Sequence, residues 1–414
     1  MKSYFKCILL SWVVCGITSC DKELAPPTPV VQASELPTLQ IFTENSAAIT
    51  SKDDYVKGTL KLDLANETES ADAIDTPMKI KGRGNSTWAL PKKPYKIKFE
   101  TKTSLLGEPA DKEWVLLANY YDKTLLRNDI AFSMGRMSKL DYTPSSNFVN
   151  VYINGKYNGI YQLSDQLKIS EDRVNVGEDG FLMEIDGKAD AEDITFKVPH
   201  VGQPINIKDP DVEVGGEAYN YLVSFLNEAD AALFAKDFTD PTSGYTKYID
   251  VESFVDWYLI NEITKNADAI FFTSCYMNLT RGGKLKMGPL WDFDLAFGNY
   301  VMDKKREIND PEGFWILKHV HWYIRLFEDP NFVQKVKERF NYFYSNREQI
   351  YSKLHEHCIY LEKSLYVENQ KWQQLCSDQY TQEHVWDHYN RELDALKLWL
   401  EHRFNWLKDQ FSAI

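Results

Sequence analysis

The stretch Asn266–Asn299, NADAIFFTSCYMNLTRGGKLKMGPLWDFDLAFGN, organises the rest of this 414-residue chain. It opens with a carboxylate, Asp268, and runs through an apolar, aromatic strand and a Gly-Gly turn into a second strand. It ends at two more carboxylates, Asp292 and Asp294. Because a hairpin returns the chain to its start, we expect the acidic ends to lie close together.

The residues around Phe293 predict which way these acids point. Strand alternation places Trp291, Phe293 and Leu295 in apolar packing, so Asp292 and Asp294 face the opposite, wetter side. Such a pair suits Mg²⁺, which takes one or two carboxylates plus phosphate oxygens. The alternative is a hairpin with solvated acids at a turn, and the spacing alone leaves both interpretations open.

The composition predicts a packed protein and excludes one class of partner. With 43% apolar and 14% aromatic residues, the chain can bury a core of one large or two ordinary domains. Its formal net charge of −14 argues against nonspecific binding to nucleic acid, whose phosphates need a basic surface. We therefore expect no nucleic-acid partner.

The N-terminus has the order of a secretory signal. Residues 1–19 place two lysines before a short apolar core, followed by small residues and Cys20. A cysteine in this position resembles the lipobox of bacterial lipoproteins, in which Cys20 would be lipidated and become the mature N-terminus. The alternative is an ordinary signal peptide with an incidental cysteine. Residues 20–36, rich in proline, predict a tether, and the expected location is the cell envelope, at the outer membrane or cell surface.

Residues 37–100 read as an antiparallel, half-buried sheet. Leu60, Leu62 and Leu64 alternate along one predicted strand and place their side chains on a single face. A glycine loop, Gly82-Arg83-Gly84-Asn85-Ser86, stands between two strands that carry lysines. This region is therefore predicted to be a β region that presents a glycine loop.

The glycine loop and the strand after it have two interpretations. Glycines let the backbone approach a ligand closely, and Arg83, Asn85 and Ser86 offer donors to phosphate oxygens. Lys96 and Lys98 share one strand face, from which one of them could reach a nucleotide phosphate. The alternative is a tight turn beside lysines that solvate an exposed sheet face. The chain contains no GxxxxGK[ST] phosphate loop, so the glycines alone do not decide.

Beyond residue 100 the patterns mix strands with helices and then become helical. Apolar positions four residues apart predict a helix over 124–135, and Asn154-Gly155 predicts a hairpin. A helix over 253–263 delivers the chain to Asp268. Residues 306–414 carry amphipathic helical stripes rich in aromatic residues. The predicted fold class is α+β, with an antiparallel β-rich N-terminal part followed by a helical C-terminal part.

Five segments in this order resemble the CotH kinase family, named for a spore coat protein with an atypical protein-kinase-like fold. Together they cover roughly residues 75 to 345, and residues 101–305 would form the kinase-like core. The segments are Gly82–Ser86 with Lys93–Phe99; Leu117–Asn119 with Leu126–Asn128; Val151–Gly155 with Gly159–Leu163; Asn266–Asp268; and Pro289–Asp294 with Gly298-Asn299.

The resemblance implies an ATP-dependent kinase that requires Mg²⁺ or Mn²⁺ and phosphorylates Ser or Thr of secreted or envelope proteins. Under it, Asp268 accepts the hydroxyl proton and Asp292 binds the metal, with Asp294 as a second ligand. One of Lys96 and Lys98 would hold nucleotide phosphates. Phosphoryl transfer depends mainly on positioning and on neutralising charge, which such groups can provide.

One departure from the kinase pattern follows Asp268. Thr273-Ser274 stand where kinases carry an asparagine metal ligand. The alternative function is therefore a non-catalytic surface lipoprotein that uses the same fold as a binding or assembly module. Catalysis requires Asp268 and Asp292 together, whereas a scaffold has no use for the pair.

Overall fold

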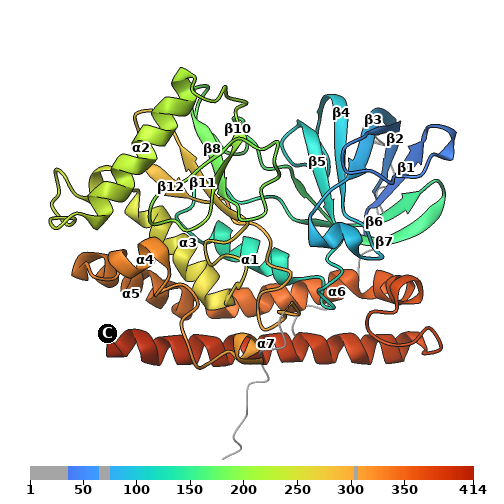
Figure 1. Ribbon diagram of the computed structural model, residues 1–414. Helices are drawn as coiled ribbons and strands as arrows, with labels where there is room; N and C mark the ends of the chain where they lie inside the picture. The colour runs from blue at the N-terminus through green and yellow to red at the C-terminus, as the bar shows by residue number, and fades with distance from the viewer. Residues whose placement is uncertain (1–35, 65–74, 303–305) are drawn as a thin grey trace, which may run out of the picture. The chain divides into compact units, whose positions relative to one another are not determined.

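The first strands of the chain close into a barrel. The protein is described by a computed structural model, which covers residues 36–64, 75–302 and 306–414. The barrel order is β1-β2-β3-β4-β5-β7-β6, and its last seam is a parallel pairing of β1 with β6 (Figure 1). The strands are β1 (Thr38–Thr43), β2 (Val56–Asp63), β3 (Asp75–Gly82), β4 (Tyr95–Thr103), β5 (Asp111–Leu117), β6 (Asn147–Ile153) and β7 (Lys156–Asp165).

Strand alternation fills the barrel as the leucine pattern predicts, because Leu60 and Leu62 point inward and are buried beside Ile97 and Trp114. The antiparallel, half-buried sheet expected over 37–100 is present as β1 to β4, but it is only part of a closed barrel. β5, β6 and β7 complete the wall, so the barrel extends past the predicted boundary at residue 100, which falls inside β4. Pairing between β1 and β6 is a long-range contact that no local pattern encodes.

A second sheet follows in the order β12-β11-β8-β10-β9. Its central pair joins β8 to β11 in antiparallel register, with Glu184 opposite Tyr276. The predicted hairpin within 266–299 is confirmed as β11 and β12, which pair directly. The strands are β8 (Phe181–Ile185), β9 (Thr195–Phe196), β10 (Ile205–Asp209), β11 (Cys275–Leu279) and β12 (Leu285–Met287).

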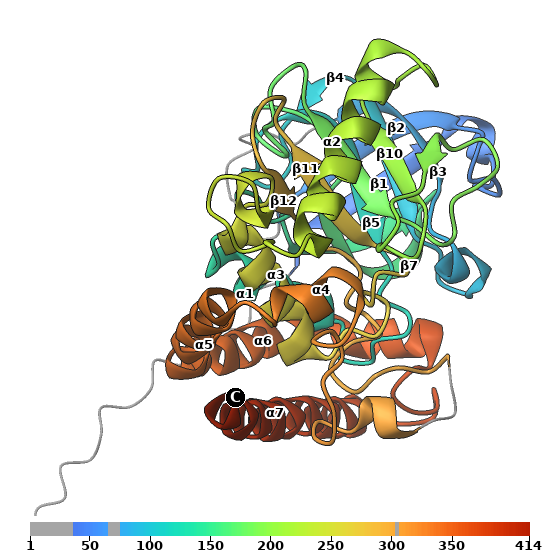
Figure 2. The same ribbon diagram turned by 60° about the vertical axis from the view of Figure 1, so that its left-hand side comes forward.

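Helices line this sheet and form the C-terminal part. Tyr221 of α2 stacks on Phe181 of β8, with ring centroids 6.1 Å apart. The helical C-terminal part is confirmed, and α6 and α7 lie side by side in both views (Figures 1 and 2). The helices are α1 (Arg127–Arg136), α2 (Glu217–Phe234), α3 (Val251–Thr264), α4 (His321–Leu326), α5 (Pro330–Ser345), α6 (Arg347–Trp372) and α7 (Gln382–Ala413).

A buried ion pair joins α6 to the barrel. Lys92 Nζ lies 2.6 Å from Glu368 Oε1 and donates to the Ile160 carbonyl at 2.5 Å. The second oxygen, Glu368 Oε2, accepts from the Ile160 amide at 2.6 Å. Lys92 is fully buried and Glu368 nearly so. Each charge therefore has both a counter-charge and a backbone partner.

The predicted signal peptide (1–19), Cys20 and all but the last residue of the tether (20–36) lie outside the described residues. Their assignment stays a prediction. Within the described ranges, no helix combines the length and the apolar character that crossing a membrane requires.

Candidate active site

A cleft with a cavity volume of about 270 Å³ collects most of the predicted site residues. Its walls come from the glycine loop after β3, the end of β8, and the loops on either side of the β11–β12 hairpin. Six of the predicted residues line it, and their roles stay predictions: Asp268, Asp292, Asp294, Arg83, Asn85 and Ser86.

Asn266 connects the two acidic loops. Its side-chain amide donates to the Asp292 carbonyl at 3.3 Å, and its Oδ1 accepts from the Asp268 amide at 3.3 Å. The same amide also donates to Asn261 Oδ1 at 3.2 Å, which fixes it to α3. The α3 helix itself starts as predicted, because the Asp250 side chain accepts from the Ser253 amide. One asparagine thus holds both acids at the end of one helix.

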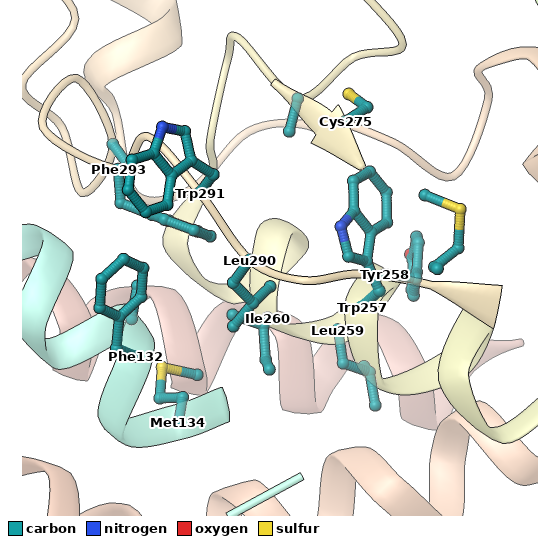
Figure 3. Close-up of a cluster of buried hydrophobic side chains, with 14 of the residues drawn as sticks. Phe132, Met134, Trp257, Tyr258, Leu259, Ile260, Cys275, Leu290, Trp291 and Phe293 are labelled. Atoms are coloured by element: carbon teal, nitrogen blue, oxygen red, sulfur yellow. The ribbon is translucent and has the colours of Figure 1, made fainter. Parts of the chain in front are cut away.

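The loop that carries Asp292 and Asp294 is not a strand. β12 ends at Met287, and Asp292 has a φ of 67°, a left-handed backbone conformation that residues other than glycine rarely adopt. The prediction that strand alternation aims the two acids is therefore wrong, although both line the cleft. Trp291 and Phe293 are buried as expected, beside Phe132 of α1 (Figure 3).

A chain of side-chain amides fixes this loop to the barrel. The Phe293 amide donates to Asn128 Oδ1 at 2.7 Å, and Asn128 Nδ2 donates to Asn119 Oδ1 at 3.1 Å. Asn119 in turn donates to Gln162 Oε1 of β7 at 3.0 Å. The sequence places Asn128 off the apolar stripe of its predicted helix, yet it is buried. Its role is to position the loop between Asp292 and Asp294.

The glycine loop brings Arg83 over the acids. Gly84 has a φ of 84°, and a Cβ on Gly82 would lie 2.3 Å from the Trp88 ring, so both positions require glycine. The Arg83 guanidinium lies 5.4 Å from the Trp291 ring centroid. Burial lowers the pKa of Arg83, while the charges of Tyr276, Asp292 and Glu184 act in the opposite direction. An arginine remains protonated at any physiological pH, so the cleft contains a fixed positive charge.

Burial and neighbouring charges raise the pKa of two carboxyl groups in the cleft. Burial, and then the charge of Asp292, raises the pKa of Asp268 to about 6. Burial also raises the pKa of Asp294 well above its usual range, and the charges of Asp292 and Asp268 add to the effect. Ser274, which stands where kinases carry an asparagine metal ligand, donates from Oγ to Asp292 Oδ2 at 3.2 Å. Its hydroxyl therefore contacts one of the two candidate metal-binding acids. The charge of Lys188 lowers the pKa of Asp268, but this effect is smaller than that of burial.

These residues fit a hard divalent cation. Within the described ranges, no three His, Cys, Asp or Glu side chains form a complete metal-binding group. A typical Mg²⁺ site nevertheless takes only one or two carboxylate ligands from the protein, and phosphate oxygens and water provide the other ligands. Asp292 and Asp294 are the residues that would hold the cation.

Lys96 and Lys98 do not line this cleft. Both point outward from β4 and form ion pairs with Glu113 of β5, at 3.3 Å and 2.9 Å. The expected contact of one of them with nucleotide phosphates therefore has no support in the geometry. The alternation of β4 alone could not predict that both lysines would form ion pairs with Glu113, because Glu113 belongs to β5.

Six charged residues of the cleft were missed in the sequence: Glu184, Asp186, Lys188, Asp190, Asp193 and Lys208. Glu184 is buried, accepts from the Ser274 amide at 2.9 Å and lies 3.5 Å from Lys208 Nζ. Burial raises the pKa of Glu184. The alternation of acids with apolar residues over 181–186 indicated a strand with acids on one face. The sequence did not show that this strand pairs with β11, and this pairing places Glu184 in the cleft.

A second, narrower pocket adjoins the cleft. It shares Arg83, Asp292 and Asp294 with the cleft and adds the apolar surfaces of Leu117 and Ala118 at the end of β5. Its cavity volume is only about 40 Å³, so it is an extension of the cleft with a charged side and an apolar side.

Comparison with known proteins identifies a family. The family model described as CotH kinase protein matches residues 80–407, from β3 to α7. The match includes every residue of the cleft named above. No curated protein matches the sequence.

Proposed function

The chain belongs to the CotH kinase protein family, and on that premise we propose that it transfers a phosphoryl group from ATP to a Ser or Thr hydroxyl of a secreted or envelope protein. The observation that carries this proposal is the convergence of Asp268, Asp292 and Asp294 with Arg83 on one cleft. An atypical protein-kinase-like fold belongs to the same proposal, with the barrel and the helical part as its two sides.

Asp268 is the proposed acceptor of the hydroxyl proton. A general base works best when its pKa lies near the operating pH, and a pKa of about 6 leaves Asp268 ionised yet basic enough at neutral pH. It follows α3, and its backbone amide donates to Asn266 Oδ1, so the backbone that carries the carboxylate is fixed where a substrate hydroxyl would approach.

The remaining charges of the cleft are proposed to hold ATP. Asp292 and Asp294 would hold Mg²⁺ or Mn²⁺, which would neutralise the charge that develops on the transferred phosphoryl group. Arg83 supplies the fixed cation for phosphate oxygens in place of Lys96 or Lys98, and Asn85 and Ser86 add donors from the exposed loop. Leu117 and Ala118 offer an apolar surface to the adenine ring.

The site of action remains part of the proposal. A signal peptide over 1–19 and a lipid on Cys20 would place the enzyme in the bacterial envelope, attached through residues 20–36. Its protein substrates would then be secreted or envelope proteins.

Binding and transfer are tested separately. Fluorescent ATP is titrated into the wild type, Asp292→Asn and Asp268→Asn with Mg²⁺ or Mn²⁺, and phosphate transfer to a Ser/Thr peptide library is followed with radiolabelled ATP. Asp292→Asn is expected to lose metal-dependent binding. Asp268→Asn is expected to bind ATP normally but transfer phosphate about a hundred- to ten-thousandfold more slowly. The exposed Asp179→Asn serves as the charge-matched control.

Absence of ATP binding with either metal, or binding that Asp292→Asn leaves intact, overturns the kinase proposal. The non-catalytic binding module would then be the better account of the fold.

A further inference from the structure

Five lysines gather on the outer face of β2, β3 and β4, and we call this surface the lysine face: Lys57, Lys79, Lys81, Lys96 and Lys98. Strand pairing sets them directly against one another. Lys57 lies opposite Lys79, and Lys79 lies opposite Lys98. In a second row Lys81 lies opposite Lys96. Like charges opposite each other destabilise a sheet, so the fold alone gives no reason for this arrangement.

The lysine face is only partly neutralised by the protein. Glu113 pairs with Lys96 and Lys98. Lys57, Lys79 and Lys81 form no ion pair with any carboxylate in the described part of the chain. The Tyr55 ring lies 4.7 Å from Lys79 Nζ and 5.0 Å from Lys81 Nζ, which orders the amines without cancelling their charge.

The acids that do face this side of the barrel lie at its borders. Asp75 of β3 stands opposite Lys61 of β2, beyond the lysine face, and Glu100 is exposed at the far end of β4. Glu44 also lines the hollow that contains Lys57, Lys79 and Lys98, as does Glu100. Five lysines against Glu113, Glu44 and Glu100 still leave a local positive charge in a protein whose formal net charge is −14.

An exposed aromatic side chain lies on the same side of the barrel. Phe42 of β1 is 43% exposed and stands opposite Thr59 of β2, whose outward side chain follows Lys57 along the strand. A surface that combines lysines with an exposed aromatic ring suits an anionic lipid interface, where lysines are attracted to the headgroups and aromatic rings lie at headgroup level. A surface for a soluble polyanion would need no such ring.

We propose that the lysine face docks the barrel on an anionic phospholipid surface, with Phe42 entering the headgroup layer. The proposal requires neither catalysis nor a lipid on Cys20. It agrees with the place of β1, which begins at Thr38, directly after the predicted tether. The negative charge of the rest of the molecule would be repelled from the same surface, so docking would also orient the barrel.

Vesicle binding tests the proposal. Residues Ala33–Ile414, which form a compact unit and lack Cys20, are sedimented with phosphatidylglycerol–phosphatidylcholine vesicles and with phosphatidylcholine vesicles. Each lysine near an anionic bilayer strengthens binding by roughly fivefold, so Lys57→Gln/Lys79→Gln/Lys81→Gln is expected to bind about a hundredfold more weakly. Binding is also expected to weaken steeply as salt is added, because the Debye length shortens.

A matched triple variant separates the lysine face from net charge. Lys335→Gln/Lys363→Gln/Lys397→Gln removes the same charge from exposed positions on α5, α6 and α7, and its vesicle binding should equal that of the wild type. Equal losses in both triple variants, or no binding of the wild type to anionic vesicles, overturn the proposal.

Phe42→Ala distinguishes a membrane from a soluble polyanion. The variant is expected to bind anionic vesicles several-fold more weakly and to leave binding of soluble polyphosphate unchanged. If polyphosphate binds the lysine face as strongly as vesicles do and Phe42→Ala changes neither, the surface serves a soluble polyanion and the membrane proposal is wrong.

Discussion

Buried charges in this protein are arranged in two opposite ways. At the junction of the barrel with α6, Lys92 and Glu368 meet at 2.6 Å, and both also bond to the backbone of Ile160. In the candidate active site, Asp268, Asp292 and Asp294 face one another across a cleft.

The difference separates charges that serve the fold from charges to which the proposed function assigns a ligand. A buried ion pair whose remaining hydrogen bonds are made is tolerated because no group is left unpaired. A cluster of like charges weakens the folded state until something positive enters, and such violations of local rules concentrate at functional sites. Three measurements test this comparison, from the largest expected effect to the smallest.

The largest effect is expected from Glu368→Ala. The substitution leaves Lys92 buried without a counter-charge, so the free energy of unfolding should fall by about 3–5 kcal/mol. Urea denaturation followed by tryptophan fluorescence measures it. The control is Glu356→Ala on the same helix, which breaks the exposed Lys353–Glu356 pair and should cost less than about 1 kcal/mol. If both substitutions lower the free energy of unfolding by the same amount, the buried Lys92–Glu368 pair stabilises the fold no more than the exposed pair does.

A smaller effect of opposite sign is expected from Asp294→Asn. Removing one of the repelling carboxylates should raise the free energy of unfolding by about 1–2 kcal/mol in metal-free buffer. Added Mn²⁺ should stabilise the wild type more than the variant, because ligand that binds only the folded state raises its stability. Thermal melts in EDTA and in Mn²⁺ give both values. Destabilisation by Asp294→Asn in EDTA would mean that this acid serves the fold.

The smallest effect concerns pH. The pKa of Asp268 is about 6 in the folded protein, above the value of about 3.9 in an unfolded chain. The folded state therefore binds more protons between these values, and the contribution of Asp268 to stability falls as pH rises from about 4 to about 6. Asp268→Asn should thus be more stable than the wild type by about 1 kcal/mol at pH 7, and the advantage should shrink at pH 5. Melting curves at pH 5, 6 and 7 measure it, and an advantage that grows on acidification contradicts the assignment.

Local patterns in the sequence predicted the centre of this site well. A hairpin flanked by acids is encoded within one stretch, so the approach of Asp268 to Asp292 and Asp294 follows from chain geometry. The glycine loop was equally readable, since Gly82 and Gly84 are required by close packing and by a left-handed φ. Arg83 could be proposed from that loop alone.

What the sequence concealed depends on pairing between distant strands. Lys96 and Lys98 share one strand face, a pattern that predicts a nucleotide phosphate within reach, but both pair with Glu113 on β5. Glu184 reaches the cleft only because β8 pairs with β11. The helix predicted from residue 124 begins at Arg127, because Leu125 has a φ of 62° and the Asp122 side chain accepts from the Arg127 amide.

The Lys92–Glu368 pair also has a consequence for the order in which the protein is made. The ribosome completes the barrel strands long before it reaches Glu368, which follows Lys92 by 276 residues. Until α6 emerges, the Lys92 amine must remain in water, because a buried charge without a partner is too costly. The barrel wall where Lys92 packs against Gly159 is therefore expected to close only after α6 has been made. A truncated chain that ends before α6 is therefore expected to have an incompletely closed barrel and to be degraded by proteases.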